Sequence, residues 1–98
     1  MKTILKLYVT GRSPRSEQAF ANLKAICEQK LSGQYEIEVI DVLERPQLAE
    51  DERILATPTL IKLLPLPLRR LIGDLSNKEK VLLGLDLRVP SQTVDPKP

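Results

Sequence analysis

Histidine is absent from this chain of 98 residues, and cysteine occurs once, as Cys27. A single cysteine cannot form a disulfide within the chain, and without histidine a metal site of nitrogen and sulfur ligands cannot be assembled. Cys27 also lies well inside an expected helix, on its apolar side, where a small core residue is a better interpretation than a nucleophile. We therefore expect a cytoplasmic protein without a metal, a cofactor or disulfide chemistry.

A long apolar segment and a strong charge bias are also missing. The densest apolar stretch, residues 54–72, is interrupted by three prolines and three basic residues, which argues against a membrane-spanning helix. The formal net charge of +2 is too small to suggest a nucleic-acid partner. Residues 1–9 are mostly apolar, but Lys6 interrupts them and no small-residue cleavage site follows, so a strand is favoured over a secretory signal.

The hydrophobic pattern predicts one α/β domain over residues 1–88 with the element order βαβαββα. Strands are expected at residues 4–9, 35–40, 60–64 and 68–72, the second of them near an edge. Helices are expected to begin at Pro14, after an N-cap at Ser13, at Pro46 and at Ser76. Residues 89–98 are polar and rich in proline, and a disordered tail is expected there.

This order of elements, together with Ala-Thr-Pro-Thr at residues 56–59, resembles the thioredoxin fold, whose members place a cis-proline before the third strand. A proline at the start of a strand is also common in unrelated folds, where it marks the strand boundary. Redox members open the first helix with a Cys-x-x-Cys pair, because a thiolate stabilised by the helix must attack. The corresponding loop, residues 11–16, contains no sulfur. We expect no enzyme, and the alternative is a thioredoxin-like redox adaptor or enzyme that lacks its Cys-x-x-Cys pair.

Other charged clusters have simple explanations. Three consecutive acids, residues 50–52, diverge in direction on a helix, so a solvated face is favoured over an acid–base pair. Lys62, Arg69 and Arg70 could hold an anion or an acidic partner surface. A solvated hairpin with outward charges explains the same pattern.

The segment that begins at Ser76 carries two conflicting patterns. Ser76 and Glu79 form a capping box, which predicts the start of a helix. Leucines at 83, 85 and 87 alternate with Gly84 and Asp86, which is the spacing of a strand. Gly84 costs a helix interior about 1 kcal/mol relative to alanine, and Asp86 lies near the negative end of the helix dipole. Such a conflict is expected where a chain changes structure; a weak terminal helix docked by leucines is the alternative.

Five segments, in order and without large gaps, resemble the KaiB family of bacterial circadian clock proteins. They are LKLYV at 5–9, VIDVL at 39–43, PQLAE at 46–50, ILATPTL at 54–60 and IGDLSNKEKVL at 72–82. The resemblance implies two folds. One is a ground-state fold, often tetrameric, that ends in a strand, and the other is a monomeric thioredoxin-like fold.

The resemblance also implies partners and residue roles. The thioredoxin-like form is expected to bind the N-terminal ATPase ring of KaiC, to displace a sensor kinase and to capture KaiA through the exposed second strand. Self-association as a tetramer or dimer belongs to the other form. The implied partner-binding residues are Tyr8, Lys62, Arg69 and Arg70. The implied fold-switch residues are Pro58, Pro65, Pro67, Gly84 and Asp86.

The chain departs from the family pattern in three places. Gln18 replaces a basic residue early in the first helix, and Leu66 replaces a third proline in the proline-rich turn. Residues 89–98 replace an acidic tail. The sequence thus leaves open whether the chain serves a core oscillator or is a paralogue in stress response or with another KaiC-like ATPase, and which fold is its resting state.

Overall fold

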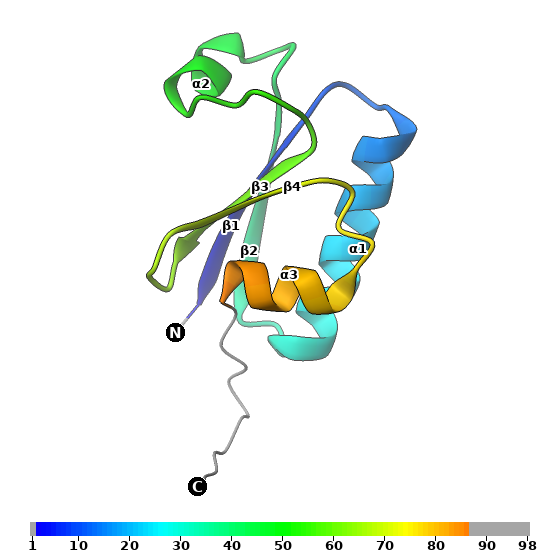
Figure 1. Cartoon of the computed structure of the whole chain (residues 1–98), viewed down its shortest axis with the longest axis vertical. Coiled ribbons are helices and arrows are strands. Elements are labelled where there is room, and N and C mark those ends of the chain that lie inside the picture. The colour runs from blue at the N-terminus through cyan, green and yellow to red at the C-terminus, as the bar shows by residue number, and fades with distance from the viewer. Residues whose placement is uncertain (1, 87–98) are drawn as a thin grey trace, which may run out of the picture.

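The computed structural model of the chain describes residues 2–86, and the tail expected at 89–98 lies outside them. Figure 1 shows the arrangement of the elements. The expected order βαβαββα is confirmed. The elements are β1 (Thr3–Val9), α1 (Pro14–Lys30), β2 (Tyr35–Asp41), α2 (Pro46–Asp51), β3 (Thr59–Leu64), β4 (Arg69–Ile72) and α3 (Lys78–Leu85).

The four strands form one mixed sheet in the order β2-β1-β3-β4. β1 runs parallel to β2 and antiparallel to β3, and β3 and β4 form an antiparallel hairpin. β1 is apolar on both sides and lies between β2 and β3, while β2 lies at an edge, as its more polar pattern predicts. β4 forms the opposite edge.

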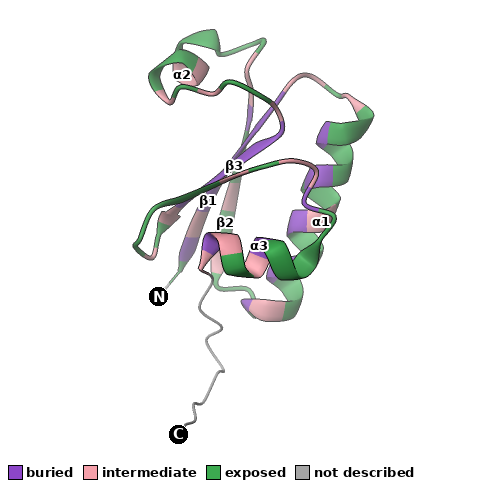
Figure 2. Cartoon of the chain, viewed as in Figure 1, coloured by how far each residue is buried: buried purple, intermediate pink, exposed green. Residues whose placement is uncertain are grey.

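The larger core lies between the sheet and the pair of helices α1 and α3 (Figure 2). Its buried residues come from β1, β3 and both helices and include Leu5, Leu7, Leu23, Leu60 and Val81. Burial of each such side chain contributes about 1.5–3 kcal/mol to folding. This face of the sheet is therefore the main source of stability, and it fixes where the hairpin of β3 and β4 lies.

The N-terminus of α1 forms as the sequence predicts. The hydroxyl of Ser13 accepts a hydrogen bond from the backbone N–H of Ser16 at 3.2 Å, and Pro14 opens the helix. The chain leaves the helix through Ser32 and Gly33, whose φ angles are 50° and 80°. Glycine adopts the left-handed region without a steric penalty, so Gly33 marks the end of α1.

A smaller cluster covers the other face of the sheet. Tyr8, Ile40 and Ile61 are buried there, and Leu48 of α2 and Ile54 pack against them. α2 has six residues, none of them fully buried. Because α2 is short, residues of the neighbouring loops, such as Val42 and Ile54, also cover this face of the sheet.

The start of α3 differs from the prediction. The N-cap is Asn77, whose side chain accepts a hydrogen bond from the backbone N–H of Lys80 at 3.0 Å. Ser76 does not cap the helix; its backbone N–H donates to Asp74 Oδ1 at 3.0 Å. Asparagine is as good an N-cap as serine, and the turn held by Asp74 moves the cap one residue along. The expected capping box of Ser76 and Glu79 is therefore wrong.

Candidate protein-binding surface

The loop before α1 is held by hydrogen bonds rather than by thiols. Asp41, at the carboxyl end of β2, accepts hydrogen bonds from the backbone N–H groups of Gly11 at 3.0 Å and Leu43 at 2.9 Å. The hydroxyl groups of Thr10 and Thr57 lie 2.5 Å apart. Sequence reasoning missed this role of Asp41. The available signal was an acid that ends a parallel strand next to a loop with glycine.

The single thiol lies far from this loop. Cys27 is fully buried in the core, and burial raises its pKa to about 12, with a smaller contribution from the charge of Glu28. The thiol is therefore protonated at neutral pH and shielded from reagents. Among residues 2–86, no group of histidine, cysteine, aspartate or glutamate side chains could hold a metal ion.

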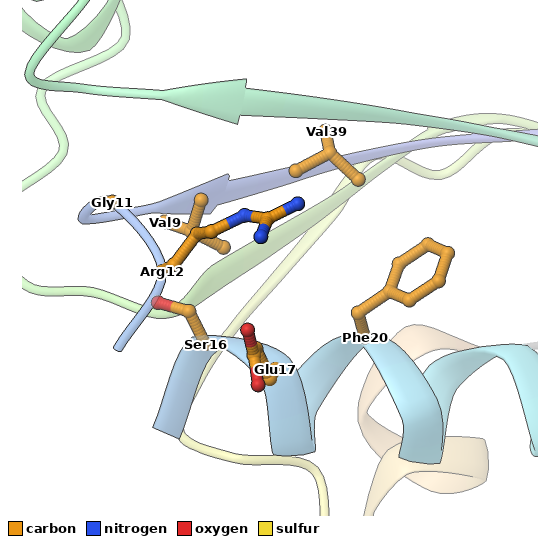
Figure 3. A pocket seen from close by; sticks show the side chains of 7 residues that line it. All are labelled: Val9, Gly11, Arg12, Ser16, Glu17, Phe20 and Val39. Atoms are coloured by element: carbon orange, nitrogen blue, oxygen red, sulfur yellow. The ribbon is translucent and has the colours of Figure 1, made fainter. Parts of the chain in front are cut away.

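A shallow groove of about 300 Å³ lies between α1 and the edge strand β2 (Figure 3). Its lining residues are Val9, Gly11, Arg12, Ser16, Glu17, Phe20 and Val39. Phe20 falls on the apolar spacing of the helix, yet 38% of its surface is exposed. Figure 3 shows its ring and the side chain of Val39 on opposite sides of the groove.

Two of the expected partner-binding residues lie on the edge strand β4. Arg69 and Arg70 are both exposed. Arg70 faces the α2 side, where its guanidinium lies 3.8 Å from Glu52 Oε1 and donates to the backbone carbonyl of Arg53 at 3.3 Å. Arg69 pairs with Lys62 of β3 and points to the opposite face. Among the described residues no carboxylate forms an ion pair with Arg69.

The other two expected contacts lie inside the molecule. Lys62 has no exposed surface and Tyr8 is only 1% exposed. Burial, followed by the charges of Glu52 and Glu38, raises the pKa of Tyr8. In this form both side chains are covered by the rest of the chain, and their part in partner binding stays a prediction. The hairpin pattern did not distinguish an inward from an outward lysine.

The expected fold-switch residues surround the hairpin and the end of α3. The peptide bonds before Pro58, Pro65 and Pro67 are all cis, and the first of these agrees with the thioredoxin resemblance. Gly84 is helical within α3, and Asp86 caps the helix in the left-handed region with φ 52° and ψ 49°. Up to residue 86 the segment thus follows its helix pattern.

Exposed apolar side chains accompany the two arginines. The hairpin, β4 and α3 contribute Leu64, Leu66, Leu68, Ile72 and Leu83, which are between 48% and 82% exposed. We call these five residues with Arg69 and Arg70 the hairpin surface. It surrounds the β4 edge and includes both faces of the sheet there, because Arg69 and Arg70 point to opposite sides. It combines apolar area with positive charge, as protein-binding surfaces commonly do.

The fold and the loop geometry together define a thioredoxin-like α/β domain whose first-helix loop holds no thiol pair. The comparisons identify the family. A family model described as the KaiB domain matches residues 6–87, and the chain belongs to the KaiB family.

Known relatives and structures agree with that assignment. The chain is 62% identical to circadian clock protein KaiB3 of Synechocystis over 88% of this chain and 84% of that protein. It is 63% identical to circadian clock oscillator protein KaiB of Synechococcus elongatus over 86% and 82% of the two chains. The N-terminal domain of Synechococcus elongatus SasA matches with a TM-score of 0.69 and 29% identity over 85% and 84% of the two chains.

Thioredoxins match in fold alone. Mitochondrial thioredoxin 3 from Saccharomyces cerevisiae has a TM-score of 0.68 at 16% identity, over 87% of this chain and 77% of that one. The predicted thioredoxin-like fold is confirmed by these matches. No helix of the described residues is both long and apolar enough to cross a bilayer.

Proposed function

We propose that this chain is a non-enzymatic regulator that binds the N-terminal ring of a KaiC-type ATPase in the thioredoxin-like form and, through that complex, engages KaiA or displaces a sensor kinase. The observation that carries the proposal is the hairpin surface on a chain of the KaiB family. The role is in circadian timing or a related timing or stress response. Nearly equal identity to a KaiB3 and to an oscillator KaiB fits either role.

The edge position of β4 supports this use of the hairpin surface. An edge strand exposes unpaired backbone groups, and positive side chains along it oppose pairing with a second copy of the same strand. Arg69 and Arg70 instead complement an acidic partner and increase the rate of its association. The exposed leucines around them supply the apolar area that a stable contact requires.

The likeness to the SasA domain supports the proposed competition. Domains that share a fold can present similar surfaces to one partner, so binding of one can exclude the other. The match covers most of both chains. Competition is measured by titrating this chain into a preformed complex of the ring and a SasA-type domain.

The proposed second form is the strand-ended ground state, in which the chain self-associates. Its support is the sequence around Gly84 and Asp86, where a helix pattern and a strand pattern overlap. The family resemblance explains this overlap. Backbone chemical shifts of residues 50–90, recorded at several protein concentrations, test it. A single helix-ended species at every concentration would remove the second form from the proposal.

The binding proposal is tested with Arg69→Ala and calorimetry against a KaiC-type ring. Loss of this charge is expected to weaken binding about fivefold or more, equivalent to roughly 1 kcal/mol. Lys24→Ala is the matched control, because Lys24 is an exposed cation on α1. Equal affinities of both variants and the wild type, at low and moderate salt, would show that the hairpin surface is not the contact.

The redox alternative has little physical support. The only cysteine is buried, with its pKa raised to about 12, and no second thiol exists to resolve a mixed disulfide. An insulin-reduction assay provides a direct test, and we expect no turnover.

A further inference from the structure

Lys62 occupies an unusual position for a lysine. It follows Leu60 by two residues on β3, so both side chains point to the face that α1 and α3 cover. Its surface is fully buried, and its Nζ donates a hydrogen bond to the backbone carbonyl of Asp86 at 3.2 Å. The side chain therefore joins the middle of the sheet to the C-terminal cap of α3.

Two physical effects make this contact important. A buried ammonium group is costly unless hydrogen-bond acceptors surround it. The last carbonyls of a helix lack partners within the helix and carry partial negative charge, so a cation is favourable there. The hydrogen bond thus gives the buried ammonium group of Lys62 an acceptor, and it places a cation at the negative end of α3.

α3 needs such an attachment because its other contacts are few. It has eight residues, of which only Val81 and Leu85 are buried. A helix of this length is unstable by itself in water. Leu85 packs the last turn into the core, and the hydrogen bond from Lys62 adds a polar contact at the C-terminal cap.

The residue opposite Lys62 on β4 makes the hydrogen bond to Asp86 more important for Lys62. Lys62 pairs directly with Arg69 of β4, and both point to the same face. Like charges at directly opposite positions of a sheet repel. The carbonyl of Asp86 lies 3.2 Å from Lys62 Nζ, and the partial negative charge at this end of α3 offsets part of the repulsion. If α3 moved away, Lys62 would lose the Asp86 carbonyl and retain its positive neighbour.

We propose that Lys62 is the anchor that holds the C-terminal end of α3 on the sheet, and that it is a positioning residue rather than a contact with a partner. This goes beyond the proposed function, because it holds whether or not the chain binds a KaiC-type ring. The proposal also predicts what happens to Lys62 when α3 leaves the sheet. In any form in which residues 78–86 leave the sheet, Lys62 loses the Asp86 carbonyl as an acceptor.

Lys62→Met tests the anchor, because methionine retains much of the apolar stem and removes the ammonium group. We expect amide hydrogen exchange at residues 81–86 to accelerate about tenfold or more, while exchange in β1 and β2 is unchanged. Lys6→Met is the matched control, since Lys6 lies on β1 with its side chain on the opposite face. It is expected to leave exchange in α3 as in the wild type.

Unchanged protection of residues 81–86 in a folded Lys62→Met variant would overturn the proposal. A second measurement needs no variant. In the wild-type protein, nuclear Overhauser contacts are expected between the ε-methylene protons of Lys62 and the backbone protons of residues 85 and 86. Their absence from a spectrum that shows the Leu85 core contacts would also overturn the proposal.

Discussion

Leu71 of β4 approaches Gly84 of α3 so closely that a Cβ on the glycine would lie 3.0 Å from Leu71 Cδ1. Ordinary carbon–carbon contacts lie at about 3.5–4.0 Å. The sequence explains Gly84 only as a weak point of the helix. The structure adds a second reason for it, because the missing side chain lets α3 pack directly on the hairpin.

Gly84→Ala is therefore expected to gain less than helix propensity alone suggests. Propensity favours alanine by about 1 kcal/mol, but the half-buried Leu71 must shift by a few tenths of an ångström. We expect the free energy of unfolding to rise by about 0.5 kcal/mol or less in the wild type, and by about 1 kcal/mol in a Leu71→Ala background. Urea denaturation of the four proteins measures the difference.

Ala21→Gly provides the control for that comparison. Ala21 is exposed in the interior of α1, so its replacement reports helix propensity without a neighbouring side chain. We expect a loss of about 1 kcal/mol. If Gly84→Ala changes stability equally with and without Leu71, the close contact has no energetic effect.

The corrected N-cap of α3 gives a second prediction. Asn77→Ala removes the acceptor for the backbone N–H of Lys80 and is expected to cost about 1 kcal/mol. Ser76→Ala removes a side chain that does not cap the helix, and is expected to cost clearly less. Thermal or urea unfolding compares the two variants. A larger loss for Ser76→Ala would restore the capping box that the sequence predicts.

Local signals explain how much of the fold could be predicted. Ser13 with Pro14, and Gly33, mark the ends of α1 because caps and breakers act on their immediate neighbours. The strand runs follow from period-two and fully apolar patterns. These signals depend on residues close in sequence, so the element order could be predicted without knowledge of the packing.

The candidate site was harder to predict because exposure depends on contacts far apart in sequence. Lys62 is buried, and its ammonium group contacts the end of α3, more than twenty residues later in the chain. Tyr8 is covered because Leu48 and Ile54 fold back over β1. Arg69 and Arg70 lie on an edge strand, where the sequence pattern and the structure agree that they are exposed.

The buried thiol predicts a pH dependence. An unfolded cysteine has a pKa of about 8.5, whereas burial raises that of Cys27 to about 12. Between these values the unfolded chain has released its thiol proton and the folded chain has not, so the free energy of unfolding falls as pH rises. Below about pH 8 this contribution is fully present and constant.

Cys27→Ala should make the decline between pH 9 and pH 11 shallower, whatever its effect on stability at neutral pH. Urea unfolding at several pH values measures the slope. A disulfide reagent at pH 8 supplies an independent check, because it should modify wild-type Cys27 only as fast as the protein opens. Parallel pH profiles for the two proteins, or rapid labelling of the native state, would contradict the buried position of the thiol.

Asp86 is the last residue described, and its left-handed conformation leads to a final prediction. At φ 52° an L-residue is strained, and glycine is the preferred residue after the last helical turn. Asp86→Gly retains the carbonyl that accepts from Lys62 Nζ, so α3 should become more stable by up to about 1 kcal/mol. Ser32→Gly is the control, since Ser32 has φ 50° after α1. Slower amide exchange in α3 for Asp86→Gly, and not for Ser32→Gly, is the expected result; faster exchange would mean that the aspartate side chain, rather than the backbone, stabilises this end of the helix.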